Sequence, residues 1–280
     1  MKDLSFGTAT LADLETALIW AAQEGWNPGQ DDAEAFWAAD PNGFFVARLS
    51  GEIIAAISVV NHCDSMAFLG LYLCKPEFRA QGVGFALWRH ALRHAGTRCV
   101  GLDGVAEQEA NYAKSGFVRT GTTTRLQGKA PKTTIEGTRA FDAARDFAAV
   151  ATLDQRANGY SRPRFLTNWV AEGGATRKTV VFSQNGEVSG FATIRLCQEG
   201  AKIGPITAPD ASTALALLSA AAASFDIRDV TLDLPDYAIE FHKALERRGF
   251  VKTFETARMY FGSPPTPSPL NMAIATMELG

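Results

Sequence analysis

The sequence predicts an α/β fold, built as two tandem copies of one domain in which strands and helices form layers. Two observations lead to this prediction. Short apolar segments typical of strands are interspersed with amphipathic, helical segments along all 280 residues. Segments of the first half also return in the second half at a nearly constant distance, which indicates an internal duplication. The expected parts are a first domain at 1–128, a linker at 129–132 and a second domain at 133–280.

Three pairs of similar segments support the duplication. In each pair, a turn or strand sequence of the first half is found again in the second half. The pairs are 51–58 with 186–193, 100–103 with 230–233, and 116–120 with 249–253. Beyond the last pair, Arg125 corresponds to Arg258. Repeats of this length are about the size of a domain, so each copy is expected to fold as one.

The first copy is expected to open with helices. Amphipathic periodicity predicts a helix at 8–24, which the break at 26–29 ends, and a short helix at 31–39, which the turn at 40–43 ends. Apolar runs bounded by turns then predict strands. These strands are expected at 43–49, 52–61, 67–74, 99–103 and 117–127, with helices at 85–95 and 106–115 between them.

The second copy is expected to repeat this order from about residue 133. Its first hairpin uses an apolar strand at 178–183 and a second one after the turn at 186. Asp210 or Ser212 is suited to cap an Ala- and Leu-rich helix that extends to Phe225. A Pro-rich piece at 263–269 leads to a last strand, expected at 272–278.

Composition excludes several classes of protein. The net charge is −3, so no basic surface for nucleic acid is expected. Apolar residues make up 46%, but no apolar run is long enough to span a membrane. The start of the chain has no signal-peptide pattern, and the four cysteines have no metal-site or disulfide spacing. We therefore expect a cytoplasmic protein without a metal. His90 and His94 lie four residues apart, but without a third ligand they are expected to be a solvated helix face.

The most informative stretch is 79–84, which reads Arg-Ala-Gln-Gly-Val-Gly. It lies between a strand and a helix, so backbone N–H groups and the positive end of the helix converge at one point. Gly82 and Gly84 allow close approach, and Arg79 or Gln81 can add polar contacts. The stretch predicts an anion site, most simply for a pyrophosphate. The second copy has 203–210 at this place, with two prolines and no pair of glycines, so no such site is expected there.

The order of elements, together with the Arg-x-x-Gly-x-Gly loop, resembles the GNAT superfamily of acyl-CoA N-acyltransferases. Asn111-Tyr112-Ala113-Lys114-Ser115-Gly116-Phe117 is similar to the segment that ends the family's penultimate helix. The sequences at 24–29 and 101–105 narrow the resemblance to bacterial proteins with two such domains. The resemblance implies a mixed, mainly antiparallel sheet flanked by helices in each domain, and acetyl-CoA as the second substrate.

The resemblance also implies positions for the bound acyl-CoA. In this family the fourth and fifth strands splay apart, and the thioester enters between them. The expected contacts of coenzyme A are Tyr72, Leu73, Cys74, Arg79, Ala80, Gln81, Gly82, Val83, Gly84, Phe85 and Asn111. Trp26 and Asn27 are expected on the acceptor side.

Tyr112 is the expected general acid, because a phenol can protonate the thiolate that leaves. The second copy has Leu245 at this position, so one active site per chain is expected. The general base is less defined by the sequence. Glu24, Asp31, Asp32 and Asp103 are candidates, and Asp103 is preferred because it ends a buried strand, although it is equally suited to cap the next helix.

The resulting hypothesis is an N-acetyltransferase that acts on a small primary amine by direct attack, with no nucleic acid or membrane as a partner. Two alternatives stay open: an acyl-CoA-binding protein without activity, and an acyltransferase with another donor or acceptor. The sequence does not identify the amine, and a homodimer built through the second copy is a further open arrangement.

Overall fold

The computed structural model describes residues 3–131, 135–266 and 268–280. The first repeat contributes β1 (Leu4–Thr8), α1 (Leu11–Gln23), α2 (Asp32–Ala39), β2 (Phe44–Leu49), β3 (Glu52–Asn61), β4 (Met66–Cys74), α3 (Val83–Ala91), β5 (Cys99–Gly104), α4 (Glu109–Lys114) and β6 (Val118–Lys129). The second contributes β7 (Thr138–Ala140), α5 (Ala143–Asn158), α6 (Pro163–Trp169), β8 (Arg177–Gln184), β9 (Glu187–Leu196), β10 (Ala201–Thr207), α7 (Ala211–Ala223), β11 (Asp229–Pro235), α8 (Ile239–Glu246), β12 (Val251–Phe261) and β13 (Asn271–Ala273). The predicted α/β class with a largely antiparallel sheet is confirmed.

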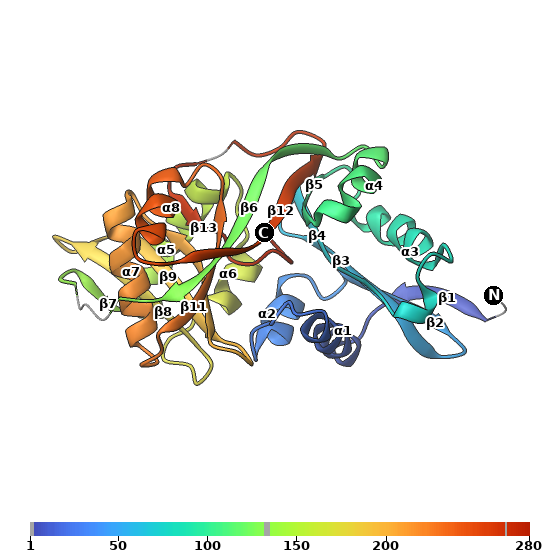
Figure 1. Cartoon of the computed structure of the whole chain (residues 1–280), viewed down its shortest axis with the longest axis horizontal. Helices are drawn as coiled ribbons and strands as arrows, with labels where there is room; N and C mark the ends of the chain where they lie inside the picture. The colour runs from blue at the N-terminus through green and yellow to red at the C-terminus, as the bar shows by residue number, and fades with distance from the viewer. Residues whose placement is uncertain (1–2, 132–134, 267) are drawn as a thin grey trace.

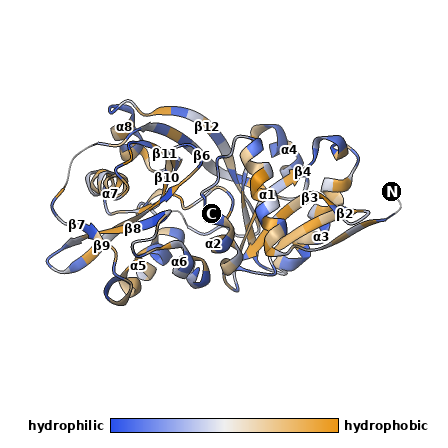
Figure 2. Ribbon diagram, turned by 90° about the horizontal axis from the view of Figure 1, so that it is seen from below, coloured by the Kyte–Doolittle hydropathy of each residue, from blue (hydrophilic) through white to orange (hydrophobic). Residues whose placement is uncertain are grey.

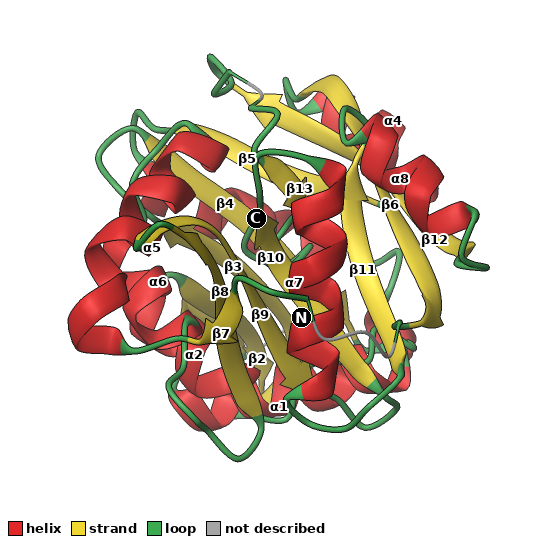
Figure 3. Cartoon of the chain, turned by 90° about the vertical axis from the view of Figure 1, so that its left-hand side faces the viewer, coloured by secondary structure: helices red, strands yellow, loops and turns green. Residues whose placement is uncertain are grey.

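The two repeats form two lobes that share one continuous sheet (Figure 1). In the first lobe, α1 packs on β3 and β4 from one face, and α3 packs on β2 to β4 from the other. In the second lobe, α5 packs on β9 and β10 while α7 crosses the opposite face (Figure 3). Hydrophobic residues gather on the strands between these helix layers, which is where the cores lie (Figure 2).

The long strand that follows the last helix of each repeat, β6 or β12, is exchanged with the other repeat. The strand order across the middle of the sheet is β4-β5-β12-β6-β11-β10. The second repeat's β12 therefore pairs with β5 of the first repeat, and the first repeat's β6 pairs with β11 of the second. Each lobe borrows a strand, so the sheet of the first lobe is completed only by residues that lie more than 100 positions later in the chain.

The exchange creates two equivalent ion pairs. Arg125 of β6 donates two hydrogen bonds to Asp233 of β11, at 2.7 and 2.8 Å. Arg258 of β12 donates two to Asp103 of β5, at 3.0 and 2.6 Å. The arginines correspond to one another in the duplication, as do the aspartates, so each pair joins one residue from each repeat. The crossed pairs are therefore the same contact made twice.

The loops of the two repeats also match. The β2–β3 hairpin turns through Ser50 and Gly51, and the β8–β9 hairpin turns through Asn185 and Gly186, all four with positive φ. Positive φ at both turn residues is the geometry that two-residue hairpins prefer. The backbone N–H of Phe117 donates to Tyr112 and that of Phe250 to Leu245, which confirms that Tyr112 and Leu245 are equivalent positions.

Three expectations need correction or fall outside the described residues. Residues Leu4–Thr8 form an edge strand paired with β2, and the first helix starts only at Leu11, after the capping residue Thr10. The last strand is limited to Asn271–Ala273, because the following residues run between the two lobes instead of along a sheet. Lys129 belongs to β6, whereas residue 132 of the expected linker and the start of the second copy lie outside the described residues.

Within the described residues, no helix combines the length and the apolar character needed to cross a bilayer. Asp210 caps α7 by accepting from the backbone N–H of Thr213 at 2.8 Å, so it fills the position that the sequence left open between Asp210 and Ser212.

Candidate active site

A gap opens between the parallel strands β4 and β5. Their pairing runs from Met66 with Cys99 to Leu69 with Leu102 and then stops. Beyond this point β4 continues to Cys74 while it pairs only with β3 on its other edge. The splay implied by the family resemblance is therefore present, and it leaves backbone groups of 70–74 available on the open edge.

A bulge in β4 lies at the start of this gap. Leu73 pairs with Ala56 and Gly70 pairs with Ser58, so two residues of β4 lie opposite one residue of β3. Leu71 there adopts a φ of +46°, which is unfavourable for a side chain without local compensation. A bulge redirects the side chains that follow it, and the next residue is Tyr72. Nothing in the apolar pattern of β4 predicted the bulge.

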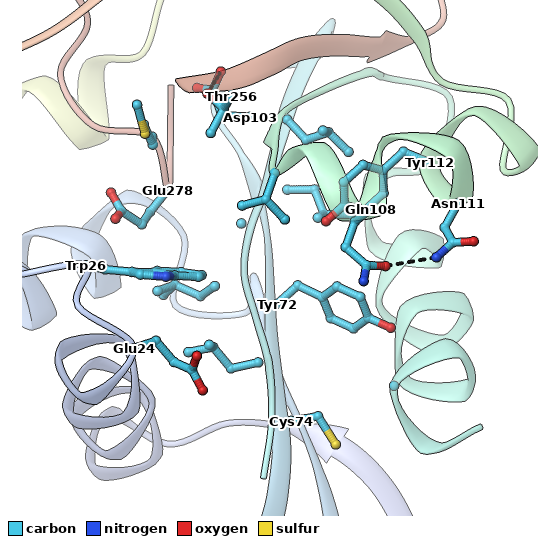
Figure 4. Close-up of a pocket in the computed structure, with 18 of the residues that line it drawn as sticks. Glu24, Trp26, Tyr72, Cys74, Asp103, Gln108, Asn111, Tyr112, Thr256 and Glu278 are labelled. Carbon is cyan, nitrogen blue, oxygen red and sulfur yellow. Dashed lines mark hydrogen bonds between the residues drawn. The ribbon is translucent and has the colours of Figure 1, made fainter. Parts of the chain in front are cut away.

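A cavity of about 740 Å³ extends from the gap in both directions. Its lining includes Glu24, Trp26, Tyr72, Leu73, Cys74, Arg79, Ala80, Gly82, Gly84, Phe85, Asp103, Asn111 and Tyr112 from the predicted set. Figure 4 shows that Tyr72, Tyr112, Gln108 and Asn111 lie on one side of the strands, and that Trp26, Glu24 and Glu278 lie on the other. The gap thus connects a compartment near α3 with a second one next to α1.

The loop before α3 forms an anion cradle. Ala80 and Gly82 have φ values of +60° and +81°, and α3 begins directly afterwards at Val83. In the described part of the chain, the backbone N–H groups of residues 80–85 donate to no protein acceptor. Six free donors at the positive end of a helix fit a diphosphate. A Cβ on Gly84 would lie 2.6 Å from the Tyr72 hydroxyl, so this position has no room for a larger residue.

Three residues of the predicted coenzyme contact set have their side chains engaged elsewhere. Arg79 donates to the Cys74 carbonyl at 2.9 Å and also pairs with Glu24. Gln81 donates to the Glu77 carbonyl at 2.7 Å, and the side chain of Val83 is buried in the core. These side chains hold the loop in place; of the three residues only Arg79 lines the cavity, and only Gln81 and Val83 have a backbone N–H without a protein acceptor in the described part of the chain.

Tyr112 and Tyr72 point into the compartment next to α3. The Tyr112 ring stacks on Trp88 at 5.4 Å between centroids, and it packs closely on Gly104. Burial raises the pKa of Tyr112 well above that of free tyrosine, with a further contribution from Tyr72, and burial also raises the pKa of Tyr72 to about 12. Both phenols are therefore protonated at neutral pH and can donate a proton or a hydrogen bond.

The second repeat forms part of the wall of the compartment next to α1. Lys202 of β10 donates to the Trp26 carbonyl at 2.7 Å. Asn27 donates to the Glu199 carbonyl at 2.8 Å and accepts from the Glu199 N–H, so its side chain joins the lobes. The prediction that places Asn27 in the acceptor site is not supported, because Asn27 does not line the cavity, whereas Trp26 does.

The aspartates considered as bases are engaged in ion pairs. Asp103 accepts from Arg258 through both oxygens and from Thr123 at 2.8 Å, and its side chain is completely buried. Asp31 and Asp32 both pair with Arg177 across the lobes. Although burial opposes ionisation of Asp32, the nearby cations Arg195 and Arg177 hold its pKa below the usual value. These carboxylates stabilise the junction of the repeats, and the preferred assignment of Asp103 as base is not supported.

Comparison with known sequences identifies the family. The chain is 34% identical over 279 residues to holothin acyltransferase from Pseudoalteromonas sp. (strain SANK 73390), which covers 97% of this chain and 93% of the relative. The model of the Acetyltransferase (GNAT) family matches residues 11–117, and that of the Acetyltransferase (GNAT) domain matches residues 150–273. The chain belongs to the GNAT family of acyltransferases. Its two repeats are therefore two GNAT domains.

Solved structures show the same fold. A crystal structure from Pyrococcus horikoshii superimposes with a TM-score of 0.83 at 19% identity, and covers 100% of this chain and 97% of the other. A tandem GNAT protein from the clavulanic acid biosynthesis pathway gives a TM-score of 0.62 at 17% identity, with 95% and 99% covered.

The second GNAT domain has no equivalent gap in the described residues. The parallel pairing of β10 with β11 ends at Lys202 and Thr231, as it does between β4 and β5. Here, however, β13 pairs with β10, and the N–H of Ile274 donates to the Asp233 carbonyl at 2.9 Å. The chain itself fills the space that is open in the first domain.

Several cavity residues were missed by the sequence analysis. Gln108 lies just before Asn111, whereas the others come from segments far from the motifs: Arg125, Phe254, Thr256, Met277 and Glu278. Strand exchange brings Phe254 and Thr256 to the site, and no local sequence pattern predicts that exchange. Glu278 did carry a signal, since it is the only charged residue in 271–280. In the described part of the chain, no group of three or more potential metal ligands is found.

Proposed function

We propose that this GNAT protein transfers an acetyl group from acetyl-CoA to a primary amine of a small molecule, in the first domain and by direct attack. The observation that carries the proposal is the cavity that joins the free amides of 80–85 with Tyr112 and passes through the gap between β4 and β5. The cradle fits a diphosphate, and the open edge of β4 fits the amide-bearing arm of the coenzyme.

The chemistry assigned to the chain is simple. Acetyl-CoA, when bound, supplies an activated acyl group as a thioester. The residues at 80–85 would hold its diphosphate, and 72–74 would hold its arm and orient the carbonyl. The amine enters from the side of Trp26, so that it faces the thioester through the gap. Tyr112 gives its proton to the departing sulfur, which prevents the reverse reaction of the thiolate.

Two features support a direct attack over a covalent enzyme intermediate. The Cys74 thiol lines the cavity, but burial raises its pKa even though Arg79 acts in the opposite direction, so it is a poor nucleophile. Cys74 also has no histidine among the other residues that line the cavity.

The acceptor is proposed to be a small primary amine rather than a protein. The second domain contributes Glu278 to the wall next to α1, and the cavity of about 740 Å³ has the size of a small-molecule site. The similar protein from Pseudoalteromonas is named for the acylation of holothin, and holothin is therefore a reasonable first acceptor to test.

The test is release of free thiol from acetyl-CoA across a panel of amines that includes holothin, with the acylated amine identified by mass spectrometry. The proposal predicts equal amounts of thiol and product with at least one amine. Gly84→Val should abolish the reaction by filling the cradle, whereas Gly7→Val, which has open space around it on β1, should not. Thiol release no faster than buffer with every amine would contradict the proposal.

A further inference from the structure

The C-terminal segment 274–280 leaves the second domain and lies against the compartment next to α1 in the first domain, where the amine is proposed to enter. The backbone of Glu278 packs so closely on Gly70 of β4 that any Cβ there would collide with the Glu278 carbonyl. Gly70 lies at the bulge, where β4 and β5 separate. The segment therefore reaches the gap itself, at the point where an amine would meet the thioester.

Three contacts hold this segment in position. His62 donates through Nε2 to the Leu279 carbonyl at 2.7 Å. Arg162, paired with the buried Asp154, donates to the Gly280 carbonyl oxygen at 2.6 Å. The N–H of Gly280 also donates to the Thr276 carbonyl. All residues of 274–280 are buried, so the segment is a fixed wall of the site.

The Glu278 side chain points into the cavity on the side of Trp26 and Glu24 (Figure 4). Its Oε2 accepts a hydrogen bond from the Thr276 hydroxyl. No other hydrogen bond to its carboxylate is found within the described residues, and Oε1 is not enclosed by protein. Glu278 thus has one oxygen positioned by the protein and one available to a ligand.

The other carboxylates around the cavity lack this availability. Asp103 is enclosed and paired with Arg258, and Glu24 is paired with Arg79 near the cradle loop. Of the acidic side chains that line the cavity, Glu278 is the one without an ion pair in the described part of the chain.

The charges around Glu278 are mostly positive. Burial acts to lower the pKa of Arg125, Arg195 and Lys202, and the negative charge of Glu278 acts to raise it in all three. The cations that interact with Glu278 are Arg125 of β6, Arg195 of β9 and Lys202 of β10. Arg125 is paired with Asp233 of β11, and Arg195 with Asp32 of α2. Two of these cations already have a partner, so Glu278 adds its negative charge to a partly compensated cluster.

We infer that Glu278 is the general base of the first domain, supplied by the C-terminal end of the second. This inference rests on the proposed acyl transfer. Oε1 takes a proton from the ammonium form of the substrate, and the lone pair of the resulting neutral amine attacks the thioester carbonyl carbon. The C–N bond forms as the C–S bond breaks, and Tyr112 protonates the sulfur. The nitrogen that is now bonded to the acyl group passes one of its two remaining protons to the Tyr112 phenolate, which restores the phenol. Glu278 then releases its proton to solvent. Base and acid lie on opposite sides of the gap, which matches the two ends of the reaction.

The test compares the wild type with Glu278→Gln, using the full chain and the best amine of the panel. The inference predicts that kcat falls about 100- to 1000-fold, while coenzyme A affinity by calorimetry stays within about twofold. It also predicts that the acid limb of the pH profile of kcat/KM, present in the wild type, is lost in the variant. Glu52→Gln, on an exposed hairpin of the same domain, is the matched control and should behave as wild type.

A second variant covers the case in which Glu278→Gln disturbs the fold. Glu278→Ala should lose the same activity, and added formate should restore at least tenfold of it, because a small carboxylate can occupy the space that the substitution leaves. Unchanged turnover and pH profile in Glu278→Gln, or absence of rescue in a folded Glu278→Ala, would overturn the inference and leave the proposed function standing. A wild type inactive with all amines would overturn both.

Discussion

Tyr112 combines the position and the protonation state that a general acid needs. Its ring is fixed between Trp88 and Gly104, and its hydroxyl lines the cavity that begins at the cradle. Burial is the main reason that its pKa is raised, so the phenol keeps its proton at neutral pH. The same burial makes a tyrosinate base implausible, because the charged form would lack solvation.

Tyr112→Phe removes this proton and little else. We expect kcat to fall by about 100- to 1000-fold with coenzyme A affinity nearly unchanged, because the ring still packs on Trp88. The measurement is thiol release at saturating acetyl-CoA, together with a calorimetric titration of coenzyme A. Since the pKa of Tyr112 is raised, the wild type should not lose activity through this group below about pH 10. A Tyr112→Phe variant with full turnover would show that another donor protonates the sulfur.

At the scale of elements, the crossed arginine–aspartate pairs connect the exchanged strands. Each joins an arginine of a last strand to an aspartate of the other repeat, and both pairs are almost fully buried. Burial alone would raise the pKa of Asp233, but Arg125 holds it below the usual value. A buried pair of this kind contributes most clearly when one partner is removed, since the other is then left charged without compensation.

Asp103→Asn tests this structural role against a catalytic one. We expect the free energy of unfolding to fall by about 3–5 kcal/mol, because Arg258 is left buried without its counter-charge. The control is Asp229→Asn, whose partner Lys129 is exposed, and it should change stability by less than about 1 kcal/mol. Denaturant unfolding measures both. A stable Asp103→Asn protein that has lost only its turnover would instead support Asp103 as the base.

The C-terminal segment predicts a pH dependence of stability through His62. Burial, with a contribution from Arg162, lowers the pKa of His62 to about 4, below about 6.5 in the unfolded chain. Between these values the unfolded state binds more protons, so stability rises with pH from about 4 to 6.5 and is lost as the pH falls. The contribution amounts to about 3 kcal/mol.

His62→Gln keeps a donor for the Leu279 carbonyl but does not titrate. Denaturant unfolding from pH 4 to 7 should therefore show a flatter dependence in the variant than in the wild type, with similar stability near pH 7 and a more stable variant near pH 4. Identical slopes for the two proteins would contradict the assignment of this pH dependence to His62.

At the scale of the whole molecule, neither repeat is complete alone. The first domain needs β12 to cover β5. Phe254 and Glu278 of the second domain line its cavity, and Lys202 donates to the carbonyl of Trp26, which also lines it. The second domain in turn uses β6, and its own gap is filled by β13. Duplication has thus produced one open site and one that is closed by the chain.

A fragment of residues 1–131 is therefore expected to be unstable and not to bind coenzyme A. The fragment lacks β12 and β11, so one edge of β5 and both edges of β6 would expose unpaired backbone groups. The check is circular dichroism and calorimetry of the purified fragment, alone and after mixing with residues 135–280. A folded fragment that binds the coenzyme as tightly as the full chain would contradict the view that the exchange is essential.

Much of this architecture could be predicted from local patterns. The helix and strand positions of the first repeat, the cradle loop and Tyr112 all depend on residues close together in sequence. The edge strand β1 was missed because Leu4–Thr8 is short and borders a stronger helical pattern. The exchange could not be predicted, since β6 and β12 have similar sequences and each would fit either partner. The role of 274–280 depends on contacts with His62, Gly70 and Arg162, which are distant in sequence.

The most direct test of the central claim is a crystal structure of the full chain with acetyl-CoA. The account predicts the diphosphate against the amides of 80–85, the thioester in the gap between β4 and β5, and the sulfur within hydrogen-bond distance of the Tyr112 hydroxyl. Coenzyme found on the second domain, or on the surface away from α3, would contradict it.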